Sequence, residues 1–405
     1  MADQHLRVVV HDYSGHPGQM QLSRTLACHG HDVIYQHCPS YVTGKGAVER
    51  LPSDPETLTF EPFPMKSEFN RYSVVHRVTQ EVQYGLQVGR RLTEEKPDVA
   101  VLSNVPLLAH ALLCVRLRRH QIPMVFWHQD IYSSAISATA RKKLGALGGV
   151  VAWLAEGIER FIARSSAAIV AISPTFFDKL NEWGVGDRTT VIPNWAPIAE
   201  LPVQPRRNEW SERFGLSDVP VVMYSGTLGL KHDPSILSHI ATRLAGQRPE
   251  ARVVVITEGM GRTWLETWQK EHGATNLVLL DFQSYEDLPL MLGSADVLVA
   301  ILEPDASKFS VPSKVLTYLC TQRAIMGVIP PDNSVAEILV SHHAGVVVDP
   351  SRRDEVADEV VRLLGDDALR ARMGQAGRDY AEATFSPERA AEQFEAIFGH
   401  ILASS

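Results

Sequence analysis

The stretch Val221-Val-Met-Tyr-Ser-Gly-Thr-Leu-Gly-Leu-Lys231 decides the fold class. Its uncharged first residues predict a buried strand, its two glycines predict a tight turn, and Asp233-Pro234 just beyond it predicts the start of a helix. Near the N-terminus, Leu6–Gly18 shows the same order of apolar run, glycine-containing loop and helical pattern. A strand, a turn and a helix in this order form the unit from which parallel sheets are built.

The same alternation continues through both halves of the chain. In the first half, apolar runs predict strands at Leu6–Val10, Asp32–His37, Val99–Ser103, Met124–Trp127, Ala168–Ile172 and Thr190–Ile192. In the second half, they predict strands at Val221–Ser225, Arg252–Ile256, Leu277–Leu280, Val297–Ile301, Ala324–Val328 and Gly345–Val347. Helical patterns separate these runs, among them Gln19–His29, Arg71–Glu95, Pro106–Arg119, Leu147–Arg164 and Pro174–Trp183. We therefore predict an α/β protein with two Rossmann-like, doubly wound domains that face each other across a cleft.

The domain boundary is predicted from proline content. Prolines at 197, 202, 205 and 220 mark the stretch Pro197–Pro220 as a linker. We expect an N-terminal domain at 1–197, a C-terminal domain at 198–385, and a final segment at 386–405, with a helix at Pro387–Leu402, that crosses back to the first domain. The sequence Ser334-Val-Ala-Glu337 predicts a capping box at a helix start in the second domain.

Composition excludes several classes of protein. The chain has 405 residues, of which 45% are hydrophobic and 21% charged, a globular composition that suits two domains. The four cysteines form no Cys-x-x-Cys pair, which argues against a disulfide framework or a zinc knuckle. The first 197 residues carry 20 Lys and Arg against 18 Asp and Glu, and the rest carry 19 against 29. The net charge of −8 argues against general nucleic-acid binding. The N-terminus shows no apolar cleavable leader, so we expect a cytoplasmic protein.

Two loops of the first domain follow predicted strands and carry polar residues. The loop His11–Gly18 leads into a helix, where an anion is favoured, although an ordinary turn explains it equally well. The second loop, Trp127-His-Gln-Asp130, places His128 where it could act on a bound hydroxyl group. A structural histidine is the alternative. We take Asp130 and Tyr132 as candidates on the acceptor side of the cleft.

The second domain offers two anion sites. Gly226 and Lys231 supply a glycine turn and a positive charge before a helix, as a diphosphate requires. Farther along, Ser310–Ser313 lies before another helix, with Lys314 adjacent. Glu303 stands at the end of a strand, where it can accept a hydrogen bond from a sugar or ribose hydroxyl group.

These motifs resemble those of the family-four (group one) glycosyltransferases of the GT-B fold. The resemblance covers essentially the whole chain. The chain is particularly similar to bacterial exopolysaccharide and O-antigen transferases, including the fucosamine and colanic-acid types. The segments that carry it are Ala171-Ile-Ser-Pro, Val191-Ile-Pro-Asn194-Trp, Tyr224-Ser-Gly-Thr, Ile256-Thr-Glu-Gly-Met-Gly261 and Val311-Pro-Ser-Lys-Val-Leu-Thr-Tyr318.

The resemblance implies a retaining transferase that needs no metal and no cofactor beyond its nucleotide-diphosphate sugar. It implies that the donor diphosphate lies on Gly18, Lys231 and Ser310–Ser313, that His128 lies near the transferred sugar, and that the nucleotide base lies near Asp281-Phe282. We take His128, Lys231 and Glu303 as the catalytic candidates. The donor-binding candidates are Gly18, Gly226, Thr227, Lys231, Glu258, Phe282, Asp305, Ser310, Val311, Pro312, Ser313, Lys314 and Thr317.

The chain departs from the family pattern at two places. The usual pair of glutamates falls on Phe309 and Thr317. Glu303 and Asp305 are the candidates to replace the glutamates, and Thr317 with Lys314 is the alternative that could hold the ribose. An arginine expected after Gly226 is Thr227, which leaves Lys231 as the main cation.

The acceptor is less well defined. Arg71–Arg91 and Arg141–Trp153 are basic and partly apolar, which fits either docking on an anionic membrane leaflet or ordinary helix faces packed on the sheet. The first interpretation suits a lipid-linked acceptor at the inner face of the cell membrane, and a glycan is the other acceptor class. Two alternatives to the transferase remain: a sugar-nucleotide 2-epimerase, in which Asp12 and Asp130 would act, and a non-catalytic nucleotide-sugar-binding subunit.

Overall fold

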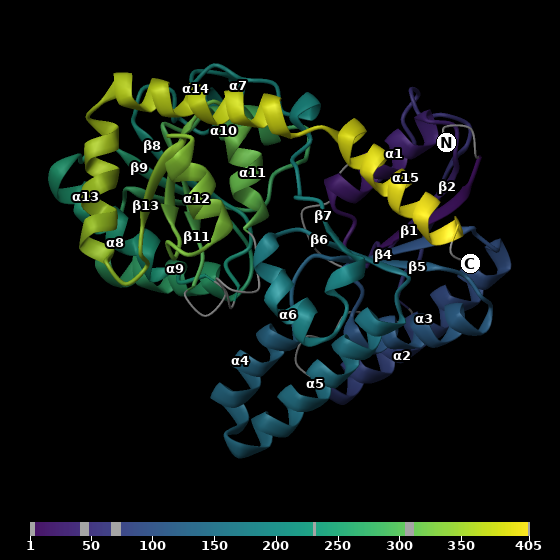
Figure 1. The fold of residues 1–405 in the computed structure, drawn as a ribbon. Coiled ribbons are helices and arrows are strands. Elements are labelled where there is room, and N and C mark those ends of the chain that lie inside the picture. The colour runs from purple at the N-terminus through teal and green to yellow at the C-terminus, as the bar shows by residue number, and fades with distance from the viewer. Residues whose placement is uncertain (1–4, 41–47, 66–73, 230–231, 304–311, 404–405) are drawn as a thin grey trace. The chain divides into compact units, whose positions relative to one another are not determined.

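The computed structural model describes residues 5–40, 48–65, 74–229, 232–303 and 312–403. The chain divides into two compact units. Unit 1 contains residues 1–194 and 386–405, and unit 2 contains residues 195–385. Figure 1 shows the two units, with the chain entering unit 2 once and returning to unit 1 through the last helix.

Unit 1 is built on a parallel sheet. In the described part of the chain its strands are β1 (Arg7–Asp12), β2 (Asp32–His37), β3 (Leu58–Pro62), β4 (Val99–Ser103), β5 (Met124–His128), β6 (Ala168–Ala171) and β7 (Thr189–Val191). Their order across the sheet is β3-β2-β1-β4-β5-β6-β7, and each neighbouring pair is parallel. Short buried Val- and Ile-rich strands of this kind are typical of sheets with both faces covered.

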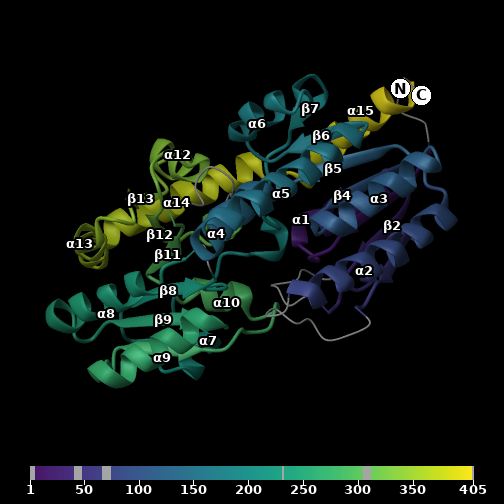
Figure 2. The same cartoon turned by 90° about the horizontal axis from the view of Figure 1, so that it is seen from below.

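Helices cover both faces of this first sheet. They are α1 (Pro17–Cys28), α2 (Val74–Glu95), α3 (Leu107–Arg119), α4 (Tyr132–Leu144), α5 (Ala146–Ser165), α6 (Phe177–Glu182) and α15 (Pro387–Ala403). The last helix, α15, lies beside α1, and its Phe394 ring packs edge-on against Trp127 of β5 at 4.9 Å between centroids. On the other face α2, α3 and α5 lie in a row (Figure 2).

Unit 2 repeats the architecture. Its strands are β8 (Val221–Ser225), β9 (Arg252–Ile256), β10 (Leu277–Leu280), β11 (Val297–Ile301), β12 (Ala324–Val328) and β13 (Gly345–Val348), in the order β10-β9-β8-β11-β12-β13, all parallel. Its helices are α7 (Glu209–Arg213), α8 (Ser235–Gln247), α9 (Met260–His272), α10 (Leu288–Gly293), α11 (Ser313–Leu319), α12 (Ser334–Ser341), α13 (Arg353–Leu364) and α14 (Asp367–Thr384).

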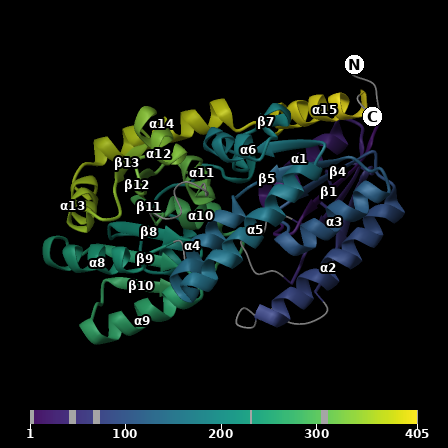
Figure 3. The same ribbon diagram turned by 60° about the horizontal axis from the view of Figure 1, so that its bottom comes forward.

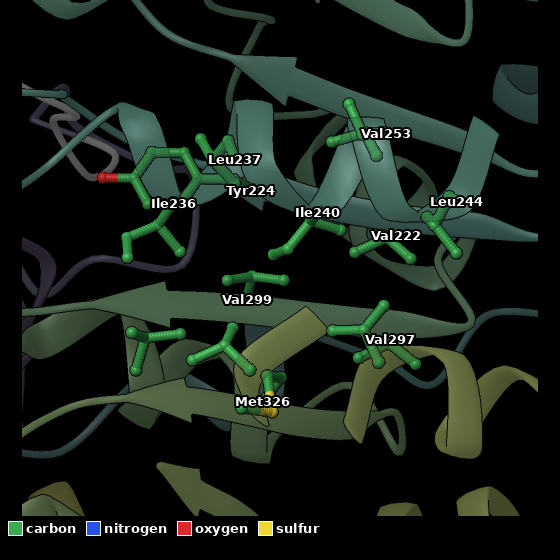
Figure 4. Close-up of a cluster of buried hydrophobic side chains, with 14 of the residues drawn as sticks. Val222, Tyr224, Ile236, Leu237, Ile240, Leu244, Val253, Val297, Val299 and Met326 are labelled. Atoms are coloured by element: carbon green, nitrogen blue, oxygen red, sulfur yellow. The ribbon is translucent and has the colours of Figure 1, made fainter. Parts of the chain in front are cut away.

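The core of unit 2 lies between α8 and its sheet. Figure 4 shows Ile236, Ile240 and Leu244 of α8 directed at the sheet, where Val222 and Val299 meet them. All five side chains are almost completely buried. Each contributes about 1.5–3 kcal/mol relative to an exposed side chain, so this layer is a large part of what holds the domain together.

Both sheets reverse their order at one point. The chain runs outward from β1 to β3 and then resumes beside β1 with β4, and it does the same around β8 and β11. Open α/β sheets bind their ligands at the carboxyl ends of the strands at such a reversal. The loops after β8 and β11 are therefore the first place to look for a site in unit 2.

The predicted fold class is confirmed, and most predicted strands match the observed ones within a residue or two. Two elements of unit 1 were missed. The strand β3 is a short edge strand that ends in Pro62, and α4 has a weakly patterned polar sequence.

Two local predictions were wrong. The cap of α12 is Asn333, whose side chain accepts a hydrogen bond from Val335 N, and not Ser334 in a capping box. The predicted linker is part of unit 2, because it contains α7 and the fully buried Trp210.

Candidate functional site

The turn after β8 is built around Gly226. Its backbone φ is +133°, a value that residues other than glycine rarely adopt. Its N–H donates a hydrogen bond to Ile256 O at 3.0 Å. A Cβ at this position would lie 3.2 Å from Nζ and 3.3 Å from Cε of Lys314. The missing side chain therefore makes room for a lysine that reaches the turn from α11.

Lys314 lies on Tyr224, the residue two before the glycine. Its Nζ is 3.8 Å from the centroid of the Tyr224 ring and donates a hydrogen bond to the Tyr224 hydroxyl group, which in turn donates to Thr227 O at 3.1 Å. Burial lowers the pKa of the Lys314 amine to about 7. Within the described ranges no carboxylate forms an ion pair with this amine, so no described side chain compensates its charge when it is protonated.

Tyr318 fixes α11 to the end of β8. Strands β8 and β11 pair only at Val297 and Leu298 and then diverge. Beyond that point, the Tyr318 hydroxyl group accepts from Ser225 N at 3.0 Å and donates to Ser225 O at 3.1 Å. Burial raises the pKa of Tyr318, so its hydroxyl group stays protonated. One buried phenol thus positions the helix that carries Lys314.

The start of α9 closes the other side of the turn. Thr257 Oγ1 accepts a hydrogen bond from Leu228 N at 3.1 Å. A Cβ at Gly261 would lie 2.4 Å from the Leu228 Cβ, so only glycine allows α9 to approach this closely. Glu258 is exposed beside this contact, directly after β9.

The predicted donor residues that the structure describes lie after the strands of unit 2 or on the helix that follows. Those near β8, β9 and β10 are Gly226, Thr227, Glu258 and Phe282, and those near β11 and α11 are Glu303, Pro312, Ser313, Lys314 and Thr317. Lys231, Asp305, Ser310 and Val311 lie outside the described residues.

The two tyrosines were not predicted as site residues. Tyr318 follows Lys314 by four positions on one helix, and this spacing places both on the same face. That spacing is a signal that could have found Tyr318. No local signal marks Tyr224, because its contact with Lys314 joins residues 90 positions apart.

In unit 1 His128 is completely buried at the end of β5. Its Nε2 lies 3.1 Å from Oε1 of Glu159, which is also completely buried. The same carboxylate accepts from the N–H groups of Tyr132 and Ser133 at 2.8 Å each and so caps the start of α4. His128 has a structural contact here, and the catalytic role expected for it stays a prediction.

The remaining predicted residues of unit 1 lie near α1 and α4. Asp130 and Tyr132 are half-buried in the β5–α4 connection. Gly18 is in the first turn of α1, and the loop before it is held by Asp12, whose carboxylate accepts from His16 N at 2.5 Å and from Asn104 Nδ2 at 2.8 Å. These contacts shape the loop but leave the ligand unidentified.

Neither a metal cluster nor a membrane-spanning helix is found among the residues that the structure describes. No three His, Cys, Asp or Glu side chains gather there in a way that could hold a metal ion. No helix in those ranges is long and apolar enough to cross a bilayer.

Two family models match the chain. Residues 15–195 match the model described as "Glycosyl transferase 4-like domain", and residues 219–366 match "Glycosyl transferases group 1". Together they cover most of both units. The chain belongs to the group 1 glycosyltransferases. It has the GT-B fold of two Rossmann-like domains, as predicted.

Curated relatives match part of this glycosyltransferase. It is 26% identical over 253 residues to the alpha-D-kanosaminyltransferase of Streptomyces kanamyceticus, a match that covers 61% of the chain and 64% of the relative. It is 25% identical over 260 residues to WcaI of Escherichia coli K12, described as a candidate colanic acid biosynthesis glycosyl transferase, with 61% and 60% covered. The chain thus spans less than two thirds of the length of these relatives.

A solved structure matches over nearly the full length. The structure of HepE from Anabaena, in complex with UDP-glucose, superposes with a TM-score of 0.71 and covers 99% of this glycosyltransferase and 100% of HepE. At 14% identity the likeness shows the fold.

Proposed function

We propose that this chain transfers a sugar from a nucleoside-diphosphate donor to a glycan or lipid-linked acceptor, with retention of configuration and without a metal or other cofactor. Its pathway would be the synthesis of a bacterial surface or exopolysaccharide. Family membership and the names of the relatives support the reaction class. The colanic acid relative supports the pathway.

The observation that carries the proposal is the Lys314 amine at the order reversal of the second sheet, which pairs with no carboxylate of the described residues. A half-buried ammonium without a carboxylate is unfavourable alone and becomes favourable when an anion binds. A diphosphate at the Gly226 turn supplies that anion. Lys231, the other cation of this turn in sequence, lies outside the described residues, and we propose that it acts on the same diphosphate.

The chemistry then depends on charge neutralisation. The bond between the anomeric carbon and the diphosphate oxygen breaks, and negative charge grows on the leaving diphosphate, next to Lys314 and Lys231. The acceptor hydroxyl group attacks from the face that the leaving group departs from and passes its proton to the diphosphate. Glu303 at the end of β11 accepts a hydrogen bond from a hydroxyl group of the sugar or ribose. His128 has a positioning role in this proposal. It contacts the Glu159 carboxylate, which fixes the start of α4 and thereby the positions of Asp130 and Tyr132.

The test is a binding titration followed by a turnover assay. Isothermal calorimetry with a panel of nucleoside diphosphates and their sugars should give binding for one base. Lys314→Met, which keeps the length of the side chain and removes the charge, should weaken that binding about 10- to 100-fold, the effect of losing one charge-assisted hydrogen bond. Lys270→Met, which removes an exposed lysine from the end of α9, is the matched control and should bind as the wild type does.

Turnover separates the three candidate functions. Incubation of the labelled donor with glycan and lipid-linked acceptors should give a labelled acceptor. Epimerised donor without acceptor would establish the epimerase instead, and tight binding without any product would establish the binding subunit. Absence of binding by any nucleoside diphosphate would overturn the donor site.

A further inference from the structure

The helical hairpin of α4 and α5 in unit 1 exposes an unusual apolar surface. The two helices are joined at Gly145 and lie side by side, and Figure 3 shows them as an antiparallel pair. They approach closely at Gly148, where a Cβ would lie 2.4 Å from Ala140 O. Within unit 1, the joined end of the pair points away from the sheet (Figure 1).

The exposed side chains lie on the first half of α5. Leu147 and Trp153 are 70% and 71% exposed, and Val150 and Leu154 are 56% and 50% exposed. Ordinary amphipathic helices bury such side chains against the sheet, which was one of the two interpretations of this segment. The structure contradicts that interpretation for these four residues. Large contiguous apolar surfaces of this kind mark a place where another body binds.

The charged residues near these apolar side chains indicate the kind of binding partner. Between Asp130 and Glu156 the sequence contains no acidic residue, but it contains the basic run Arg141-Lys-Lys143 next to the joined end of the hairpin. The first acidic residue beyond, Glu156, forms an ion pair with Lys179 at 2.6 Å, so its charge is compensated. The stretch from Ile131 to Ala155 therefore combines apolar residues with a net positive charge in its sequence, and its Arg141 side chain is exposed.

We propose that the α4–α5 hairpin docks on an anionic lipid bilayer, with Leu147, Val150, Trp153 and Leu154 in the interface and the basic run against the lipid headgroups. Apolar side chains combined with Lys and Arg are the features by which helices lie in a membrane surface. Tryptophan prefers that interface because its ring is apolar and its N–H is polar. The uncharged stretch Leu144–Ala155 is much shorter than the roughly 20 residues that a spanning helix needs, so the hairpin lies on the bilayer and does not cross it.

This docking is independent of the donor site. It involves no residue of unit 2, and it requires neither donor nor turnover. It goes beyond the proposed function because it places the enzyme on an anionic bilayer. A lipid-linked acceptor is presented at the surface of such a bilayer. Failure of docking would leave donor binding intact, and failure of donor binding would leave docking intact.

The test is co-sedimentation of the full chain with sucrose-loaded vesicles. We expect the wild type to bind vesicles of phosphatidylcholine with about 30% phosphatidylglycerol and to remain in the supernatant with phosphatidylcholine alone. Leu147→Ser combined with Trp153→Ser should weaken binding at least tenfold, since each large apolar side chain that enters the interface contributes roughly a factor of ten. Arg141→Glu with Lys142→Glu and Lys143→Glu should also abolish binding, as should about 0.5 M salt.

The matched control replaces exposed apolar residues elsewhere. Met260 and Trp264 on α9 of unit 2 are 62% and 41% exposed, and Met260→Ser with Trp264→Ser should bind vesicles as the wild type does. Among the replaced side chains, Arg141, Leu147, Trp153, Met260 and Trp264 are exposed. An unchanged melting temperature verifies the fold of each variant. Equal binding by wild type and hairpin variant overturns the proposal, as does absence of wild-type binding. Concentration-dependent dimers that the hairpin variant loses, without vesicle binding, would assign the surface to a second copy of the chain.

Discussion

The carboxyl ends of the two sheets have the same topology but opposite electrostatics. In unit 1 the buried carboxylate of Glu159 receives three donors, from His128, Tyr132 and Ser133. In unit 2 the buried end of Lys314 meets a tyrosine ring and hydroxyl group but no described carboxylate. In the first region the carboxylate is satisfied by donors of the protein itself, although Nδ1 of His128 is buried without a hydrogen-bond partner. The second region holds an amine whose charge an anion can compensate. The comparison indicates that carboxyl ends of strands in two similar sheets serve different purposes, one for rigidity and one for binding.

The largest loss of stability is expected from removal of Glu159, the carboxylate that His128, Tyr132 and Ser133 share. Glu159→Ala leaves His128 and two N–H groups without their acceptor, and the free energy of unfolding should fall by about 3 kcal/mol or more. Urea unfolding followed by circular dichroism measures it. The control is Glu156→Ala on the same helix, which removes an ion pair of a 43% exposed side chain and should cost less than about 1 kcal/mol. If the free energy of unfolding fell by the same amount in both variants, the hydrogen bonds to Glu159 would not be what stabilises this region.

The next effect concerns the turn in unit 2. Gly226→Ala introduces a Cβ within 3.2 Å of Lys314 Nζ, at a φ that alanine avoids, so stability should fall by about 2 kcal/mol. Donor binding should weaken as well, because the lysine has to move. Thermal unfolding and calorimetry measure the two effects. Gly246→Ala is the matched control, since a Cβ there meets nothing within 4 Å, and a helix gains about 0.5–1 kcal/mol from this change.

Removal of the Lys314 charge should raise the free energy of unfolding, whereas removal of Glu159 should lower it. Burial lowers the pKa of Lys314 to about 7 in the folded protein, below the 10.5 of an ordinary lysine. Below pH 7 the amine is charged in both states, so the unfavourable burial is fully present, and it fades as the folded protein releases the proton between pH 7 and 10.5. Lys314→Met should therefore stabilise the ligand-free protein on the order of 1 kcal/mol at pH 6, and less at pH 9. A lower melting temperature of this variant at pH 6 would show that the amine is already compensated.

The smallest effect is on the pH dependence of donor binding. An anion needs the protonated amine, so affinity for a nucleoside diphosphate should fall about fivefold between pH 7 and pH 8, as expected for one proton bound with a pKa of about 7. Calorimetry at both pH values measures the ratio. In Lys314→Arg the side chain stays charged, and the affinity should then be nearly constant over this range. A fivefold fall in the arginine variant would assign the titration to another group.

The strands and their order in the chain were predictable because their determinants are local. Val221–Ser225 and Val297–Ile301 are uncharged runs between turn residues, and the structure has both with the predicted bounds. The buried position of Trp210 was not predictable, since the prolines around it have the composition of a linker. The cap of α12 was displaced by one residue because asparagine and serine are both good caps and the sequence does not choose between them.

The sequence by itself determined the two doubly wound sheets and the glycine turn after β8, because each depends on residues a few positions apart. Only the tertiary structure decided which polar groups are satisfied. Glu159 meets His128 across 31 positions, and Lys314 meets Tyr224 across 90. It also decided that Leu147 and Trp153 are exposed. Burial and pairing arise from packing between distant segments, so neither could be predicted from local patterns.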